Sequence, residues 1–220
     1  MTLAVEKASK ARRLNGHPEI IVRDNVSWDE YERILRDPEM MSKRMTYDEG
    51  RLVIMSPLPR HEHEKRLIGR MIEMLTFELD IPICSLSATT WRRKQLRKGL
   101  EPDECYYVQN EPKVRGKDRI NLRRDPPPDL VVEVEVTHHP INKIAIYEAL
   151  GVPEVWVYTG KKLRTLRLTD GGYEDVEYSV ALPFLRPADF ERFLERRHSS
   201  SEHDLLRAFQ RWVLKLKKAL

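Results

Sequence analysis

The clearest hydrophobic pattern in the chain runs from residue 129 to residue 136, where apolar and acidic residues alternate. Successive side chains of a strand point to opposite faces, so this segment predicts one apolar face and one that carries carboxylates. The two sets are Leu130, Val132, Val134 and Val136 against Asp129, Val131, Glu133 and Glu135. Inside an α/β sheet, ionised carboxylates are stable only when paired, hydrogen-bonded or bound to a metal. Two interpretations remain open, a metal site or the solvated face of an edge strand.

The first half of the chain predicts a short helix, a hairpin and a long helix. Residues 1–25 are polar and lack an apolar period, so we expect a flexible lead-in there. Ser27 precedes an acidic first turn and is a helix-capping signal. A turn at residues 47–51 followed by an apolar run at 52–55 indicates a hairpin. From His61, apolar residues recur every three or four positions, which predicts a helix.

The second half alternates strand and helix patterns. Pro140 suits the start of a helix that Gly151 would end, and an apolar run at residues 152–158 follows. Strand, helix and strand in this order form a βαβ-type unit, so we expect an α/β fold with a mixed central sheet flanked by helices. Two further helices are predicted near the C-terminus, and the second carries an apolar stripe that would pack on the domain or on a second copy.

Composition limits the class of protein. The chain has 220 residues, of which 40% are hydrophobic and 34% charged, enough for one core. We expect one globular domain over residues 26–187 and a helical extension over 188–220, packed on the domain or at a dimer interface. No apolar run reaches the roughly twenty residues that span a bilayer, and no apolar signal segment opens the chain, so we expect a cytoplasmic protein without a membrane partner. Two cysteines, Cys84 and Cys105, are too few for a zinc cluster or a disulfide framework.

Basic segments lie near the acidic strand in sequence. The 39 basic residues exceed the 35 acidic ones by four, which permits a polyanionic partner. Arg92, Arg93 and Lys94 belong to the most basic run, and further basic residues occur at 113–119 and 123–124. Such segments are expected if a nucleic-acid backbone passes beside a metal site. They are equally typical of solvated hairpin loops.

Asp103 is the best candidate to join Glu133. It lies at the start of a predicted strand over residues 105–108. If that strand runs antiparallel to the acidic one, Asp103 comes close to Glu133 and Glu135. Asp129 is separated from Glu133 by four strand residues, about 13 Å, so we interpret it as a residue that begins the strand.

Other candidates lie at two helix starts. His61 and Glu62 occupy the first turn of a helix, where the helix dipole alone explains an acid, although both could reach a site. Lys143 falls in the first turn of the helix after the acidic strand, at the positive end of its dipole, so it requires an anionic partner. His138 and His139 could bind a metal, but paired histidines in a loop are more often solvated.

Several ordered motifs resemble one family. They are Met55-Ser56-Pro57 to His61-Glu62, Gly99 to Tyr107, Pro127 to Val134, and Lys143 to Tyr147 followed by Gly151 to Trp156. This series resembles the Uma2 family (DUF820) of restriction-endonuclease relatives in the PD-(D/E)XK nuclease superfamily, from about Trp28 to the C-terminal end.

The resemblance implies a restriction-endonuclease-like core that binds Mg²⁺ or Mn²⁺ and hydrolyses DNA, without an organic cofactor. Asp103 would match the metal-binding aspartate and Glu133 the acid of the Glu-x-Lys element. Glu135 stands where that element has its lysine, so Lys143 is the expected substitute and Glu135 a third metal ligand. His61 and Glu62 would orient water or relay a proton. A homodimer is expected, since paired sites cut two strands.

Two other functions remain open. The missing strand lysine is also consistent with an inactive nuclease fold that binds DNA or oligomerises. Alternatively, the same fold could act on another phosphate ester or on a nucleotide.

Overall fold

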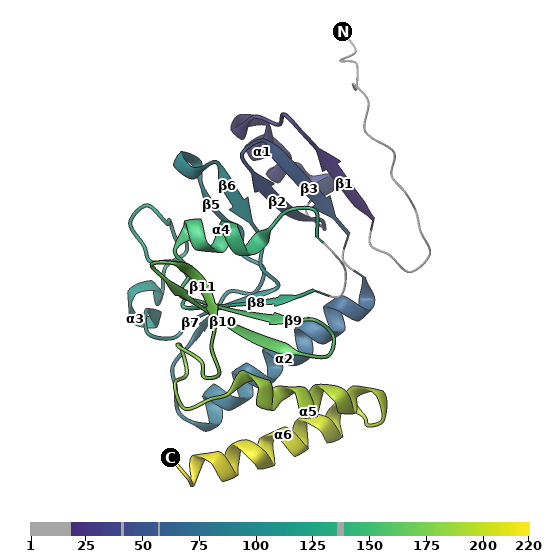
Figure 1. Ribbon diagram of the computed structural model, residues 1–220, viewed down its shortest axis with the longest axis vertical. Helices are drawn as coiled ribbons and strands as arrows, with labels where there is room; N and C mark the ends of the chain where they lie inside the picture. The colour runs from purple at the N-terminus through teal and green to yellow at the C-terminus, as the bar shows by residue number, and fades with distance from the viewer. Residues whose placement is uncertain (1–18, 41, 57, 136–138) are drawn as a thin grey trace.

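The computed structural model describes residues 19–40, 42–56, 58–135 and 139–220. Its centre is a six-stranded mixed sheet in the order β11-β10-β9-β8-β7-β4 (Figure 1). β8 and β9 are parallel and the other neighbours are antiparallel. The strands are β4 (Cys84–Ser85), β7 (Glu104–Tyr107), β8 (Leu130–Val134), β9 (Glu154–Tyr158), β10 (Leu163–Thr169) and β11 (Gly172–Asp175). The predicted mixed sheet and its βαβ unit are therefore confirmed.

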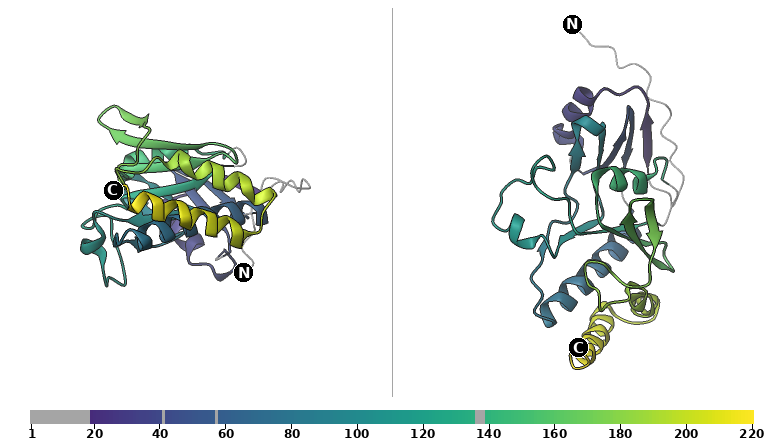
Figure 2. Two further views of the ribbon diagram at one scale, coloured as in Figure 1. Left: turned by 90° about the horizontal axis from the view of Figure 1, so that it is seen from below. Right: turned by 60° about the vertical axis from the view of Figure 1, so that its left-hand side comes forward.

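A second, antiparallel sheet of five strands was not predicted. Its order is β1-β3-β2-β6-β5, and it lies at the end of the molecule opposite the C-terminal helices (Figure 2). The strands are β1 (Ile20–Arg23), β2 (Arg44–Asp48), β3 (Arg51–Met55), β5 (Trp91–Arg93) and β6 (Lys98–Leu100). The expectation of a flexible lead-in was wrong for residues 20–23, because Ile20 to Arg23 pair with Leu52 to Met55 of β3, a partner distant in sequence. Residues 1–18 lie outside the described part.

Helices cover both faces of the central sheet. On one face α2 (Pro59–Glu78), α5 (Glu191–Leu194) and α6 (Glu202–Lys217) enclose a core that includes Leu130, Val132 and Val134 of β8. On the other face α4 (Lys143–Leu150) packs over a core that includes Val131 and reaches the second sheet. Helix α1 (Trp28–Leu35) covers the second sheet, and α3 (Glu111–Val114) lies in the β7–β8 connection. The predicted alternation of faces along β8 is confirmed.

Local sequence explains where the helices begin and end. The Ser27 hydroxyl accepts a hydrogen bond from Glu30 N and caps α1, as predicted. Pro59 occupies the first turn of α2, so this helix begins two residues before His61. Asn142 caps α4 by accepting from Ala145 N, and Gly151 ends it with a φ of 76°, in the left-handed region. Single 3₁₀ turns lie at Pro38–Met40, Lys94–Leu96, Pro187–Phe190 and Glu195–His198.

The C-terminal helices are packed on the domain. Helix α6 lies along α2, and Leu205, Phe209 and Val213 enter the core beneath it. A buried ion pair joins the two regions, since Arg197 lies 2.9 Å from Glu64 of α2. This places the apolar stripe of α6 inside the molecule. Among the described residues, no helix combines the length and the apolar character needed to cross a bilayer.

Candidate active site

Asp103 and Glu133 come together because β7 and β8 are antiparallel neighbours. Glu104 pairs with Val132 in the register, so the residue before β7 faces the end of β8. The Asp103 carboxylate accepts a hydrogen bond from Val134 N at 2.8 Å. Asp103 is 3% exposed and Glu133 is fully buried. The antiparallel pairing, which the sequence analysis had left as a condition, is present, and it places two carboxylates side by side in the interior.

Both oxygens of Glu133 have partners on α4. Lys143 Nζ donates to one oxygen at 2.7 Å, and the Tyr147 hydroxyl donates to the other. Burial raises the pKa of Glu133 to about 7, helped by the nearby charge of Asp103, although Lys143 opposes this shift. Burial alone would lower the pKa of Lys143, but the two carboxylates outweigh it and raise the pKa. Lys143 is therefore a buried cation beside Glu133, the anionic partner expected at this helix start.

His61 connects helix α2 to the same carboxylates. Its Nε2 lies 3.2 Å from Asp103 Oδ2. Burial favours the neutral ring, but the hydrogen bond to Asp103 prevails and raises the pKa of His61. The Asp103 pKa shifts the other way: burial would raise it, yet His61 and Lys143 lower it to about 2. The two residues form a charge-assisted pair, and the structure thus brings His61 to Asp103.

Glu62 faces a residue that the sequence analysis missed. Arg44 of β2 lies between two carboxylates, 3.8 Å from Glu62 and 3.8 Å from Glu101. The Arg44 Nε and one Glu62 oxygen are buried and have no hydrogen-bond partner among the described residues. Glu62 also pairs with Lys65 at 3.1 Å. These groups extend the polar cluster from Asp103 toward the second sheet.

Asp129 and His139 contact groups other than the Asp103 and Glu133 carboxylates. Asp129 accepts hydrogen bonds from Val108 N at 2.7 Å and from Asn110 N at 2.8 Å. It therefore secures the end of β7, in agreement with its interpretation as a residue that begins the strand. His139 lies beside Thr46 at 3.5 Å and beside the Ile141 carbonyl at 2.9 Å, in the turn before α4. His138 lies outside the described residues.

The donor set at Asp103 and Glu133 fits a hard divalent cation. Carboxylate oxygens are the ligands that Mg²⁺ prefers, and a cation would relieve the repulsion that helps to raise the Glu133 pKa. Across the described ranges, no three His, Cys, Asp or Glu side chains lie close enough to hold one ion. Glu135 follows β8, is exposed, and donates its backbone N–H to Tyr158 O at 2.8 Å. Its role as a third ligand remains a prediction.

The predicted DNA-binding residues lie on β5 and the turn after it, away from this cluster. Arg92 pairs with Glu32 and Lys94 with Asp29, each at 3.2 Å, so both are connected to α1. Arg93 lies between them in sequence and forms no ion pair with any described residue. The three neighbours therefore differ in how much of their charge is compensated.

Comparisons with known proteins agree with this architecture. The family model Uma2, described as "Putative restriction endonuclease", matches residues 28–195. A crystal structure from Anabaena variabilis, described as a "putative nuclease belonging to DUF820", is similar with a TM-score of 0.50 and 14% identity. The similarity covers 77% of this chain and 99% of that chain, and at this identity it supports the fold alone. No curated protein sequence matches the chain.

Proposed function

Because the chain belongs to the Uma2 family, to which residues 28–195 match, we propose that it is a metal-dependent endonuclease that hydrolyses phosphodiester bonds of DNA. The observation that carries the proposal is the buried group of Asp103, Glu133 and Lys143. Asp103 lies just before β7, Glu133 on β8 and Lys143 at the start of α4. Burying two carboxylates with one lysine costs stability, and such buried clusters are typical of functional sites.

Each residue has a distinct role in this proposal. Asp103 and Glu133 would hold Mg²⁺ or Mn²⁺, which would lower the pKa of a bound water and offset charge on the phosphate in the transition state. Lys143 Nζ, 2.7 Å from Glu133, would orient the attacking water or stabilise the developing negative charge. Tyr147 holds the other Glu133 oxygen and so fixes the carboxylate.

His61 would handle the proton that the leaving oxygen needs. Its Nε2 is held by Asp103, while its Nδ1 is buried and has no hydrogen-bond partner in the described part of the chain. Glu62 lies 3.8 Å from that Nδ1, a separation that one water would bridge. Arg44 balances the charge of Glu62 and Glu101, which keeps this route ordered.

One observation favours the rival function of an inactive module. Both Glu133 oxygens are already engaged by donors of the protein, and Lys143 forms a close ion pair with one of them. In an inactive fold these contacts would serve stability alone. In a nuclease, Lys143 would exchange this contact for the substrate when the cation binds Glu133.

Supercoiled plasmid nicking separates the two functions. Wild-type protein would be compared with Glu133→Gln in EDTA, Mg²⁺ and Mn²⁺. We expect metal-dependent nicking that the substitution abolishes. Glu195→Gln, an exposed site with the same change of charge, is the matched control and should cut like wild type. Nicking by Glu133→Gln at the wild-type rate, or no nicking by wild type in any metal while DNA binding persists, would sink the proposal.

Glu135→Gln in the same assay tests the third ligand. If Glu135 binds the metal, the variant should need a higher Mg²⁺ concentration for half-maximal nicking, with little change at saturation. An unchanged metal dependence would remove Glu135 from the site. Homodimer formation is a further part of the proposal, and the molar mass in solution by light scattering tests it directly.

A further inference from the structure

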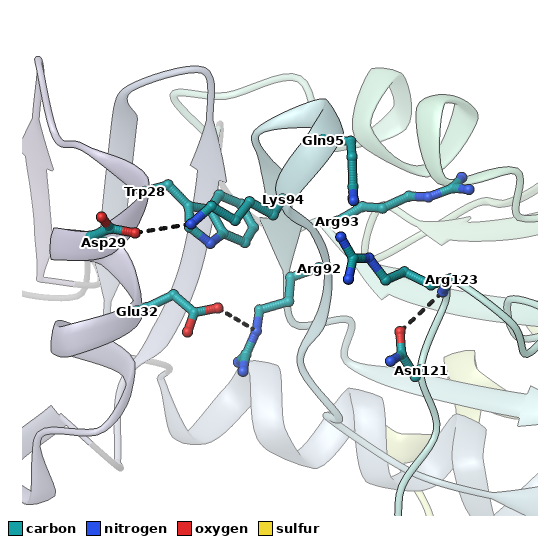
Figure 3. A pocket seen from close by; sticks show the side chains of 9 residues that line it. All are labelled: Trp28, Asp29, Glu32, Arg92, Arg93, Lys94, Gln95, Asn121 and Arg123. Carbon is teal, nitrogen blue, oxygen red and sulfur yellow. Dashed lines mark hydrogen bonds and ion pairs between the residues drawn. The ribbon is translucent and has the colours of Figure 1, made fainter.

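A second polar cleft lies away from the acidic cluster, between α1, the β5 end and the loop at 121–123 (Figure 3). Its volume is about 250 Å³, and it adjoins another cleft of about 470 Å³ through Arg93, Gln95 and Arg123. The lining contains four basic side chains and two carboxylates. The cleft is therefore positively charged and open to a ligand.

The two acids compensate only part of this charge. Glu32 pairs with Arg92 and Asp29 with Lys94, each at 3.2 Å, and Figure 3 shows both contacts at the α1 side of the cleft. Arg93 and Arg123 lie on its other side and form no ion pair with any residue that the structure describes. Two guanidinium groups without counter-ions in one cleft are typical of an anion site.

The loop that carries Arg123 is held in place by its own hydrogen bonds. Asn121 Oδ1 accepts from Arg123 N at 3.0 Å, and Asp125 accepts from Asn121 N at 2.7 Å. Lys117 in turn binds Asp125 at 2.6 Å. With its amide oxygen turned toward Arg123, Gln95 accepts from Nε at 3.0 Å. Arg123 is thus preorganised, which reduces the entropy lost when an anion binds.

The register of the second sheet limits the distance to the acidic cluster. Arg93 pairs with Lys98 on β6, and neighbouring strands are about 5 Å apart. Lys98 precedes Asp103 by five residues, which span at most about 18 Å even when fully extended. The strand spacing and the extended span together give the largest possible separation of Arg93 from Asp103. Because one DNA strand advances about 3.4 Å per nucleotide, this separation corresponds to roughly seven nucleotides at most.

We propose that Arg93 and Arg123 bind a backbone phosphate of the DNA strand, a few nucleotides from the bond that is cut. The inference rests on the proposed nuclease function and adds a substrate subsite to it. One guanidinium group can bind two phosphate oxygens at once, and contacts to phosphates fix the register of the duplex without reading its sequence. Arg92 and Lys94, bound to α1, support the cleft from the other side.

Fluorescence anisotropy with a labelled DNA duplex tests the subsite in protein that cannot cut. In a Glu133→Gln background, Arg93→Ala with Arg123→Ala should weaken binding about tenfold or more. The slope of log affinity against log salt should become shallower by about one, since the loss of one phosphate contact removes about one. The control pair Arg207→Ala with Arg211→Ala makes the same change of charge on exposed positions of α6 and should bind like the background.

Further experiments show whether the cleft binds DNA or a small anion, and whether the variants fold. The double variant Arg93→Lys with Arg123→Lys keeps the charge but loses the planar fork of guanidinium donors. Its DNA affinity should therefore lie between that of the Glu133→Gln protein and that of the double alanine variant. Unlabelled duplex should displace the label, whereas inorganic phosphate at equal phosphate concentration should not. Displacement by phosphate alone would assign the cleft to a small anion and overturn the DNA subsite. Thermal unfolding of the alanine pair should match the background within a few degrees.

The outcomes separate the two proposals. If wild type nicks plasmid and the alanine pair binds DNA like the control pair, the subsite is wrong and the nuclease stands. If the double alanine variant loses DNA binding and wild type never cuts, the subsite is supported, but the protein is a DNA-binding module and not a nuclease.

Discussion

Lys143 Nζ lies 2.7 Å from Glu133 Oε2 in the interior of the molecule, with the lysine at the first turn of α4 and the glutamate on β8. The ion pair is almost fully excluded from solvent. Removing one member of such a pair leaves an uncompensated charge, unless the partner changes its protonation. Glu133 can do so, because burial already raises its pKa to about 7.

Lys143→Ala should lower the nicking rate constant by about 100-fold or more, the size of effect expected for a lost group that stabilises developing charge. Its unfolding free energy should fall more at about pH 8 than at about pH 5, because at low pH Glu133 accepts a proton and stays neutral. Urea unfolding at both pH values measures this. Lys161→Ala, at an exposed turn, serves as the control; equal nicking by the two variants would remove Lys143 from the reaction.

Asp103→Asn should cost stability in a pH-dependent way. The folded pKa of about 2 lies below the ordinary value of 3.8, so ionised Asp103 contributes on the order of 2 kcal/mol above pH 3.8. The contribution is lost as the pH falls through about 2. In EDTA, the unfolding free energy of Asp103→Asn should be lower than that of wild type at about pH 7. The difference between the two unfolding free energies should become smaller below pH 3.8. A gap that stays constant over this range contradicts the assigned shift.

His61→Asn should slow cleavage and change its pH profile. Burial favours neutral His61, but Asp103 raises its pKa, so the ring carries its proton to higher pH than a free histidine. If it supplies a proton to the leaving oxygen, wild-type cleavage declines as the pH rises through this pKa. We expect a loss of about 100-fold and no such decline in the variant. His63→Asn, on the exposed side of the same helix turn, should keep the wild-type profile.

Glu154→Gln should destabilise the fold without touching the site. The two Glu154 oxygens accept from Trp156 Nε1 at 2.6 Å and from Ala181 N at 2.7 Å, and neither donor can reverse its role. Glutamine has one acceptor oxygen, so one buried N–H would face its NH₂ group. The expected loss is about 1–3 kcal/mol in urea unfolding. If the unfolding free energy fell no more than in the exposed Glu195→Gln variant, the loop that carries Ala181 would have to rearrange to satisfy its N–H, contrary to this prediction.

The sequence predicted the acidic strand from its short-range periodicity and the need of Lys143 for an anion from the helix dipole. The position of Asp103 beside Glu133 depended on the direction of β7, which the sequence left open. It did not reveal the second sheet, whose pairs join residues as distant as Asp48 and Lys98. The bounds of β4 also depend on tertiary pairing. The apolar residues nearby are Ile81 and Ile83, yet the strand consists of Cys84 and Ser85, because these two pair with Tyr107 and Tyr106 of β7.

Arg44 is the residue of the polar cluster that sequence reasoning missed. It is one of 39 basic residues, and no spacing relates it to Glu62 or Glu101. Its place between two carboxylates arises only when β2 pairs with β6 and α2 packs nearby. Likewise, the ion pair of Arg92 with Glu32 depends on where α1 lies on the second sheet.

The passage from β6 to β7 consists of Glu101, Pro102 and Asp103, and it carries the chain from one sheet into the other. One inserted residue here would shift Asp103 away from the Val134 amide or force β7 out of its register with β8. The turn at Asp170 and Gly171 joins β10 and β11 within one sheet, so its length does not fix the position of any residue of the acidic cluster. An insertion between β6 and β7 should therefore separate the two carboxylates of the acidic cluster, whereas an insertion at the β10–β11 turn should leave them in place.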